Sequence, residues 1–169
     1  GIDTLSGYVS LMREDSREPE RLFRDLLIGV TQFFRDTDAF AALATKVIGP
    51  ILEDKTEDDR VRVWVPGCAT GEEAYSVAIL FHEACAKMES PPEVKIFGSD
   101  LDEAALHFAR IGRYPHSIAA DVSEERLARF FESEDGSYIV RPQLREMCLF
   151  AQHNLLRDPP FSRIDLLSC

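Results

Sequence analysis

Apolar residues in the first third of the chain recur with the spacing of α-helices. One set places its members on a single helical face and consists of Leu22, Phe23, Leu26, Leu27, Val30, Phe33 and Phe34. A second set with the same spacing consists of Phe40, Leu43, Val47 and Ile48. Between them, residues 35–38 are typical of a helix end and a new N-cap, and Gly49-Pro50 is expected to weaken or kink the second helix near its end. These patterns predict two amphipathic helices within residues 1–52.

The period of the pattern changes near residue 60. Residues 53–60 hold seven charged side chains in eight positions and are predicted to be a linker. The elements predicted beyond it are a strand at Val61–Val65, a helix at about Glu72–Met88, a strand at Val94–Phe97 and a helix at about Asp102–Ile111. This alternation favours a parallel sheet with helices on both faces, and therefore an α/β fold.

The pattern of hydrophobic and polar residues is less regular between about residues 113 and 148. Tyr114-Pro115 is irregular, Ser123–Phe131 predicts a short helix, and Tyr138–Val140 follows a turn-rich segment, so we predict a small antiparallel insertion. Residues 147–152 and 164–168 are predicted as further strands. The chain is thus divided into a helical region (1–52), a linker (53–60) and a sheet domain (61–169) that contains the insertion.

Composition excludes several kinds of partner. The 169 residues include 19 Lys and Arg against 30 Asp and Glu, a formal net charge of −11, so we do not expect nucleic acid as a partner. Apolar runs such as Val77–Phe81 are far shorter than the roughly 20 residues of a spanning helix, and no signal pattern begins the chain, so no membrane insertion is expected. Four separated cysteines without a CxxC pair favour a reducing cytoplasm as the location.

The loop at residues 66–73 (PGCATGEE), between the first strand and the next helix, is the strongest candidate for a ligand site. Open α/β sheets bind ligands at the carboxyl ends of their strands, and Gly67 and Gly71 permit positive φ or a close approach to the backbone. A tight turn explains the glycines equally well. The loop lacks the third glycine of the dinucleotide fingerprint and the Lys-Ser/Thr of a phosphate loop, so a nicotinamide oxidoreductase is a distant alternative.

Acidic residues around this loop limit the kinds of ligand that it could bind. Glu72 and Glu73 would repel a pyrophosphate and would suit a ligand with positive charge, such as an amine or a sulfonium. Asp100, at the end of the second strand, can accept hydrogen bonds from ribose hydroxyls, or alternatively cap the following helix. A ribose, a cation and a carboxylate anchor together describe S-adenosylmethionine (SAM).

Four segments resemble, in order and spacing, the CheR family of chemotaxis receptor methyltransferases. They are Thr31–Asp36 (TQFFRD), Gly67–Ser76 (GCATGEEAYS), Ser99–Asp102 (SDLD) and Asn154–Asp165, in which NLL is followed by PFSRID. The sequence looks most similar to CheR-like domains of multidomain proteins, fused to methylesterase or sensor modules. The resemblance implies a class I, Rossmann-like methyltransferase domain preceded by a small helical domain. It also implies methyl transfer from SAM to glutamate side chains on cytoplasmic helices of chemoreceptors, with S-adenosylhomocysteine (SAH) as product.

The resemblance also implies roles for individual residues. Thr31 and Arg35 would line the active site and the cofactor, Gly67 and Gly71 would form the cofactor loop, Glu72 would contact the methionine part, Asp100 the ribose, and Asn154 and Leu155 the adenosine region. Taken singly, Thr31 could instead bond to its own helical turn, Arg35 could be a solvated charge, and Asn154 could form a turn.

The methyl transfer that the resemblance implies does not require a general base. A glutamate carboxylate is ionised at neutral pH and can attack the sulfonium methyl group without a general base, while Arg35 would orient it through charge-assisted hydrogen bonds. By the resemblance, Cys68 is a packing residue. The four histidines have no metal-like spacing, so we expect no metal site and place them on the surface or on helix faces.

Two features depart from the family pattern. The family usually has Asn two positions before the active-site threonine, where this chain has Gly29. The family pattern also continues after the position of Cys169 with an Arg-Asn pair, an active-site Tyr and the last strands. We therefore expect a fragment or a naturally shortened domain, whose exposed sheet edge would favour self-association. Both features motivate an alternative function, a non-catalytic regulatory or interaction module that keeps the methyltransferase fold.

Overall fold

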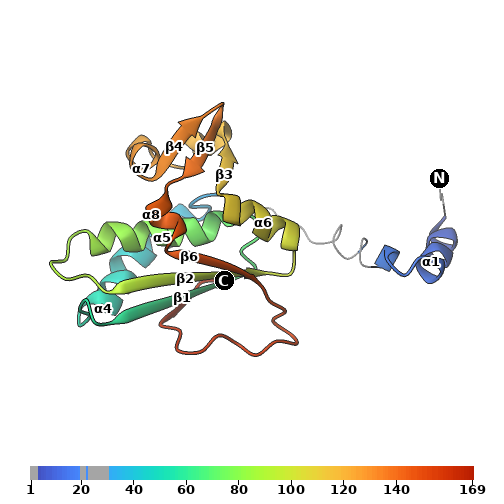
Figure 1. The fold of residues 1–169 in the computed structure, drawn as a ribbon, viewed down its shortest axis with the longest axis horizontal. Helices are drawn as coiled ribbons and strands as arrows, with labels where there is room; N and C mark the ends of the chain where they lie inside the picture. Colours follow the sequence, from blue (N-terminus) through green and yellow to red (C-terminus); the bar gives the residue numbers. More distant parts are fainter. Residues whose placement is uncertain (1–3, 20–21, 23–30) are drawn as a thin grey trace.

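The computed structural model describes residues 4–19, 22 and 31–169 (Figure 1). In chain order its elements are α1 (Leu5–Glu14), α3 (Thr37–Ala42), the π-helix η1 (Leu43–Ile48), α4 (Gly49–Leu52), β1 (Arg60–Pro66), α5 (Glu72–Cys85), β2 (Glu93–Asp100), α6 (Glu103–Ile111), β3 (Arg113–Pro115), the 3-10 helix η2 (His116–Ala120), α7 (Glu124–Phe130), β4 (Phe131–Glu134), β5 (Ser137–Val140), α8 (Pro142–Arg145), β6 (Cys148–Gln152) and β7 (Leu166–Leu167). Among the described helices, none has the length and apolar character needed to cross a membrane.

Four parallel strands form the main sheet, in the order β6-β2-β1-β7. In the central register, Val63 of β1 lies between Ile96 of β2 and Leu166 of β7, and Ile96 in turn pairs with Cys148 of β6. Because the strands are parallel, their carboxyl ends meet at one edge, where the loop after β1 and Asp100 of β2 lie. The predicted α/β fold with a parallel sheet is confirmed.

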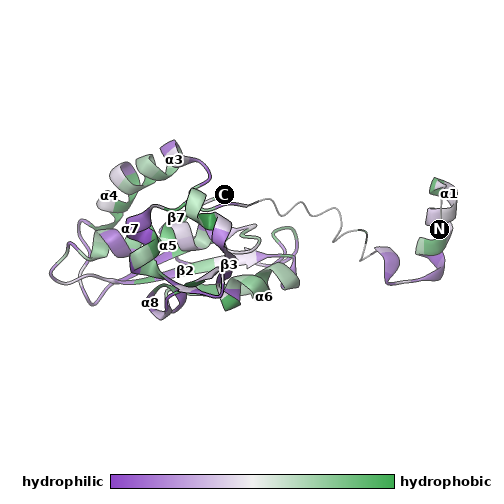
Figure 2. Ribbon diagram, turned by 90° about the horizontal axis from the view of Figure 1, so that it is seen from above, coloured by the Kyte–Doolittle hydropathy of each residue, from purple (hydrophilic) through white to green (hydrophobic). Residues whose placement is uncertain are grey.

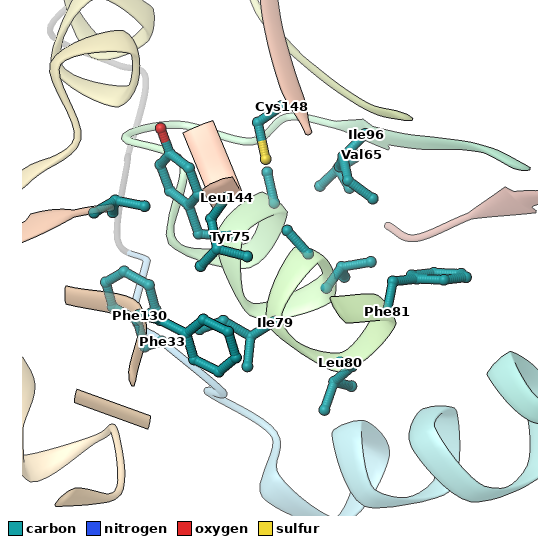
Figure 3. Close-up of a cluster of buried hydrophobic side chains, with 14 of the residues drawn as sticks. Phe33, Val65, Tyr75, Ile79, Leu80, Phe81, Ile96, Phe130, Leu144 and Cys148 are labelled. Carbon is teal, nitrogen blue, oxygen red and sulfur yellow. The ribbon is translucent and has the colours of Figure 1, made fainter. Parts of the chain in front are cut away.

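Helix α5 is the centre of the hydrophobic core, because every residue from Ala74 to Phe81 is buried. A helix that is apolar on all sides has to be covered on all sides. Figure 3 shows the side chains around it: Val65 and Ile96 from the sheet, and Phe33, Phe130 and Leu144 from other elements. Figure 2 shows α3 and α4 on one side of α5 and α6 and α8 on the other. This enclosure fixes the first turn of α5 and the loop that precedes it.

The two faces of the main sheet are covered differently. Val63 and Val65 belong to the buried cluster around α5, whereas Trp64, between them in the strand, points to the opposite face. There the Trp64 ring packs edge-on against Phe161, with ring centroids 5.1 Å apart, and against His153 at 5.4 Å. The sequence predicted helices on both faces; among the described residues, the irregular segment that joins β6 to β7 covers the Trp64 face.

Residues 113–140 contain a second, antiparallel sheet in the order β3-β5-β4. It lies in the region where the sequence predicted an antiparallel insertion. Tyr114-Pro115, which looked irregular in the sequence, forms part of strand β3, and Tyr114 pairs with Tyr138 of β5. Ser123 caps α7 by accepting a hydrogen bond from the backbone N–H of Arg126.

The start of the chain differs from the prediction at residues 31–36. The first predicted helix falls mostly on residues 20, 21 and 23–30, which lie outside the described residues, as does Gly29. Phe33 and Phe34 lie in a turn and not in a helix, and both are buried. Asp36 is the N-cap of α3 and lies within the segment 35–38, where an N-cap was predicted. The helix continues through Gly49-Pro50, but a wider π turn precedes it, since Pro50 has no N–H to donate within an α-helix.

Candidate active site

Two cavities meet at the loop after β1, because Gly67 and Ala69 line both of them. The first, called here the Asp100 pocket, has a volume of about 900 Å³ and is lined by Gly67, Ala69, Thr70, Asp100, Leu101, Asp102, Ala104, Ala105, Phe108, His153, Asn154, Leu155, Leu156 and Arg157. The second, called the Arg35 groove, has a volume of about 800 Å³ and is lined by Thr31, Gln32, Arg35, Asp36, Ala39, Phe40, Ala42, Leu43, Lys46, Val47, Gly67, Ala69, Glu73, Leu167, Ser168 and Cys169. Ligands in the two cavities would therefore meet beside this loop.

The backbone of the loop has positive φ at three residues. The values are +66° at Gly67, +44° at Ala69 and +94° at Gly71. A Cβ atom placed on Gly67 would have no neighbour within 4 Å, whereas one on Gly71 would lie 2.8 Å from the Cβ of Ala109. Gly67 thus leaves open space where the cavities meet, and Gly71 allows α6 to pack against the loop.

Asp100 joins the end of β2 to the loop. Its Oδ2 accepts a hydrogen bond from the N–H of Ala69 at 2.8 Å, and its Oδ1 accepts one from the N–H of Asp102 at 3.0 Å. Each carboxylate oxygen has a further lone pair, so the group can also accept hydroxyl hydrogens from a ligand in the pocket. The alternative that Asp100 caps α6 is wrong, because the N-cap is Asp102, whose side chain accepts from Ala104 and Ala105.

The paired acids at the start of α5 point in different directions. Glu73 lines the Arg35 groove and accepts a hydrogen bond from the hydroxyl of Ser168 at 2.7 Å. Glu72 lines neither cavity; its carboxylate accepts a hydrogen bond from the hydroxyl of Thr70, at 2.6 Å, and Thr70 lines the Asp100 pocket. Burial raises the pKa of Glu72, and this hydrogen bond opposes the shift. The sequence predicted one shared role for the two acids, but successive residues of a helix are about 100° apart and therefore point in different directions.

Thr31 and Arg35 both line the Arg35 groove, so the structure brings these two site residues together. The turn that carries them is fixed from inside the core. The N–H of Phe34 donates to Oγ of Ser76 at 3.1 Å, and that hydroxyl donates to the carbonyl of Glu72 at 2.7 Å. A buried residue of α5 therefore connects the Arg35 turn to the loop between the cavities.

Asn154 and Leu155 both line the Asp100 pocket. Asn154 also forms a turn: its Oδ1 accepts from the N–H of Leu156 at 2.9 Å, and its own N–H donates to Asp158 at 2.7 Å. The turn-forming interpretation is compatible with a place in the pocket wall. Leu155 and Leu156 are 56% and 95% exposed, which gives this wall an apolar surface.

His153 was expected on the surface or on a helix face, and this expectation is wrong. The side chain is buried and lines the Asp100 pocket. Its Nε2 lies 3.0 Å from the carbonyl oxygen of Pro159, and its ring packs against Trp64 and Phe161. Residue spacing carries little signal for this role, because the partners of His153 come from a distant strand and from an irregular segment.

Two buried side chains, one from the small sheet and one from the loop itself, pack around the cofactor loop. Tyr114 of the small sheet, only 1% exposed, donates its hydroxyl hydrogen to the carbonyl of Thr70 at 2.7 Å. Cys68 lies within the loop, and burial, followed by the charge of Asp100, raises the pKa of its thiol to about 12. Because the thiolate is the nucleophilic form, Cys68 fits a packing role.

The two cavities together offer a consistent set of groups. The Asp100 pocket has a carboxylate for hydroxyl groups and apolar walls from Phe108 and Leu155 for a planar ring. The loop leads from it toward Glu73 and Arg35, which offer opposite charges in the groove. These groups fit a nucleoside with a charged substituent in the pocket and an anionic second substrate in the groove.

Comparison with known proteins gives a matching family. Residues 29–169 match the family described as "CheR methyltransferase, SAM binding domain". An "Uncharacterized 104.1 kDa protein in hypE 3'region" of Rhodobacter capsulatus is 44% identical over 168 residues, which cover 99% of this chain and 18% of that protein.

Two relatives named "Chemotaxis protein methyltransferase" match at lower identity. The protein of Listeria monocytogenes is 28% identical over 166 residues, covering 98% of this chain and 61% of the relative. The protein of Escherichia coli is 29% identical over 162 residues, covering 92% of this chain and 54% of the relative. The chain therefore spans less than two thirds of each of these three relatives.

Proposed function

The chain belongs to the CheR methyltransferase family, whose SAM-binding domain it matches, and from this premise we propose that it transfers a methyl group from SAM to glutamate side chains of chemoreceptors. The observation that carries the proposal is the meeting of the Asp100 pocket and the Arg35 groove at Gly67 and Ala69. A cofactor and an acceptor bound in the two cavities would come together there. The names of the bacterial relatives support receptors as substrates, and we place the reaction in the cytoplasm.

The cofactor would be held by residues of the Asp100 pocket. Asp100 would accept hydrogen bonds from the ribose hydroxyls, and Phe108 and Leu155 would pack against the adenine ring. Glu72 and Glu73 would favour the positive charges of the methionine part. When bound, SAM supplies a sulfonium methyl group, whose carbon bonds to a carboxylate oxygen as the carbon–sulfur bond breaks and the electron pair stays on sulfur.

The acceptor glutamate needs orientation and not deprotonation. Its carboxylate is ionised at neutral pH, so no proton has to be removed before attack. Arg35 would hold one carboxylate oxygen through charge-assisted hydrogen bonds while the other faces the loop. Phe40 and Leu43 line the same groove and would exclude water. Water stabilises the sulfonium and the carboxylate of the reactants more than the neutral ester and thioether of the products, so its exclusion favours the transfer.

The test is methyl transfer from labelled SAM to chemoreceptor cytoplasmic fragments, with the ester detected as methanol released by base. We expect Arg35→Ala to lower transfer by about 100-fold, because a misplaced nucleophile loses the benefit of proximity, with a much smaller change in SAH affinity. We expect Asp100→Asn to weaken SAH binding measured by isothermal titration. Arg60→Ala is the matched control, because Arg60 pairs with Glu93 on the surface, its side chain is 77% exposed, and it lines neither cavity.

The same assays distinguish the alternative function. A chain that binds SAH, but forms no base-labile ester on any receptor fragment, would be a non-catalytic module that keeps the methyltransferase fold. A chain that binds neither SAM nor SAH would contradict the proposed use of the Asp100 pocket altogether.

A further inference from the structure

The Arg35 groove is longer than a single reacting carboxylate requires. It follows α3 and η1 from Arg35 to Val47, so its residues span three helical turns. Phe40, Leu43 and Val47 recur at helical spacing and give the groove an apolar floor. Lys46 lies nine residues beyond Thr37, the first residue of α3, and so on the order of 12 to 15 Å from the Arg35 end of the groove. Within the described residues, most of the groove therefore lies beyond the reach of the acceptor carboxylate.

The charges of the groove are distributed unequally along it. The two acidic residues that line it, Asp36 and Glu73, lie at the Arg35 end. Asp36 follows Arg35 in the chain. Glu73 lies in the first turn of α5, close to Ser76, whose hydroxyl accepts a hydrogen bond from the N–H of Phe34. Lys46 is the charged residue of the other end. Its ammonium group forms no ion pair with any residue in the described part of the chain. In a chain with a net charge of −11, this leaves a local positive end on the groove.

We propose that Lys46 binds an acidic side chain of the protein substrate, two to three helical turns from the acceptor glutamate, and so contributes to the choice of glutamate. The inference rests on the proposed function and specifies its substrate as an acidic, amphipathic helix. A distance of about 15 Å corresponds to about ten residues of helix, and the length of the lysine side chain extends the range down to about seven. Apolar side chains between the two acids would pack on Phe40 and Leu43, as in other helix-in-groove complexes.

Binding of helical peptides to the SAH-loaded chain tests this inference. Each fluorescently labelled 25-residue peptide has a leucine stripe, one acceptor glutamate, and either Glu, Gln or Lys at seven or ten positions from the acceptor, on either side. With the unsubstituted chain we expect Glu to bind about three- to fivefold more tightly than Gln at the matching position, the size of an exposed ion pair. Lys46→Gln should remove this preference, and Lys46→Glu should reverse it in favour of Lys.

Lys87→Glu is the matched control, because it changes the charge by the same amount as Lys46→Glu. Lys87 is exposed and lines neither cavity. It should keep the preference for Glu, and SAH affinity should be the same in all variants. Equal binding of the Glu and Gln peptides by the unsubstituted chain, or an unchanged preference in Lys46→Gln, would overturn the inference.

Methyl transfer to the same peptides separates this inference from the proposed function. If the preference depends on Lys46 but no peptide becomes esterified, the docking role stands and the proposed activity fails. If Lys46→Glu methylates the Glu and Lys peptides with the same ratio as the unsubstituted chain, the activity stands and the role of Lys46 fails.

Discussion

At the scale of single residues, the two glycines of the loop between the cavities have different functions. Both have positive φ, so alanine at either position meets a left-handed penalty of about 1–2 kcal/mol. At Gly71 the added Cβ would also lie 2.8 Å from Ala109, whereas at Gly67 it would meet nothing within 4 Å. We predict that Gly71→Ala lowers the free energy of unfolding by about 3 kcal/mol or more, and Gly67→Ala by about 1–2 kcal/mol.

Urea unfolding of the two variants measures the difference, and SAH titration adds a second readout. Because Gly67 lines both cavities, Gly67→Ala should weaken SAH binding more than its modest loss of stability explains. Equal destabilisation by the two substitutions would contradict the contact between Gly71 and α6.

Glu72 gives the stability of the protein a specific dependence on pH. Burial raises its pKa above the ordinary carboxyl value of 4.5, so the folded state holds the proton more tightly than the unfolded state. The resulting stability is present below pH 4.5 and is lost as the pH rises through the raised pKa. Glu72→Gln cannot ionise and keeps an acceptor for the Thr70 hydroxyl, so we predict that it is more stable than the unsubstituted chain at pH 7.5, with a smaller gain at pH 5.

Urea unfolding at both pH values provides the measurement, with Glu57→Gln in the exposed segment before β1 as the control. The same variant should bind SAM less tightly, because it lacks the negative charge that favours the methionine part. A gain in stability that is the same at pH 5 and pH 7.5 would show that ionisation of Glu72 is not its cause.

At the scale of elements, Tyr114 connects the small sheet to the cofactor loop. Its ring packs edge-on against Phe33 at 4.9 Å and Phe108 at 5.4 Å, and its hydroxyl bonds to the carbonyl of Thr70. Tyr114→Phe keeps the ring but leaves that carbonyl without its donor, so we predict a loss of about 1–2 kcal/mol in unfolding free energy and weaker SAH binding.

Tyr138→Phe is the matched control, since Tyr138 faces Tyr114 across the same sheet and has no hydroxyl hydrogen bond among the described contacts. Unfolding curves and SAH titrations of both variants make the comparison. If Tyr138→Phe weakens SAH binding as much as Tyr114→Phe does, the effect belongs to the small sheet as a whole and not to the bond with Thr70.

The elements that the sequence predicted well are those whose signals are local. The signals of the β-branched run at Val61–Val65, of the loop glycines and of the short helix predicted at Ser123–Phe131 each act within a few residues. What was missed depends on distant partners. The turn at Phe33-Phe34 exists because both rings enter a core built by α5, and the cover of Trp64 comes from Phe161, almost a hundred positions later.

The candidate site follows the same division. Thr31, Arg35 and Asn154 were predicted from the resemblance, and Gly67 and Asp100 also from their places at the ends of strands; each lines at least one of the two cavities. His153 and Tyr114 could not be found from spacing, because their roles arise from packing between elements that are far apart in the chain. The place of Lys46 in the groove depends on the course of η1 past the loop, which residue spacing does not indicate.

At the scale of the whole molecule, the net charge of −11 acts on both substrates with opposite sign. The negative field favours a sulfonium cation and opposes an approaching carboxylate, which is why local cations such as Arg35 and Lys46 matter in the groove. SAM and SAH have nearly the same shape and differ by the charged methyl group. Comparing their binding therefore isolates the electrostatic contribution of the protein to cofactor recognition.

We predict that raising NaCl from 50 mM to 500 mM weakens SAM binding about two- to fivefold more than SAH binding, since salt screens charges beyond a few ångströms. Isothermal titration of both ligands at each salt concentration measures this, and adenosine, which has no charge, should show little change. Glu72→Gln should reduce the difference between SAM and SAH, because the affected charge lies next to the pocket. Equal salt dependence of SAM and SAH would mean that the acids around the loop do not recognise the sulfonium, and the preference for SAM would then have to come from shape alone.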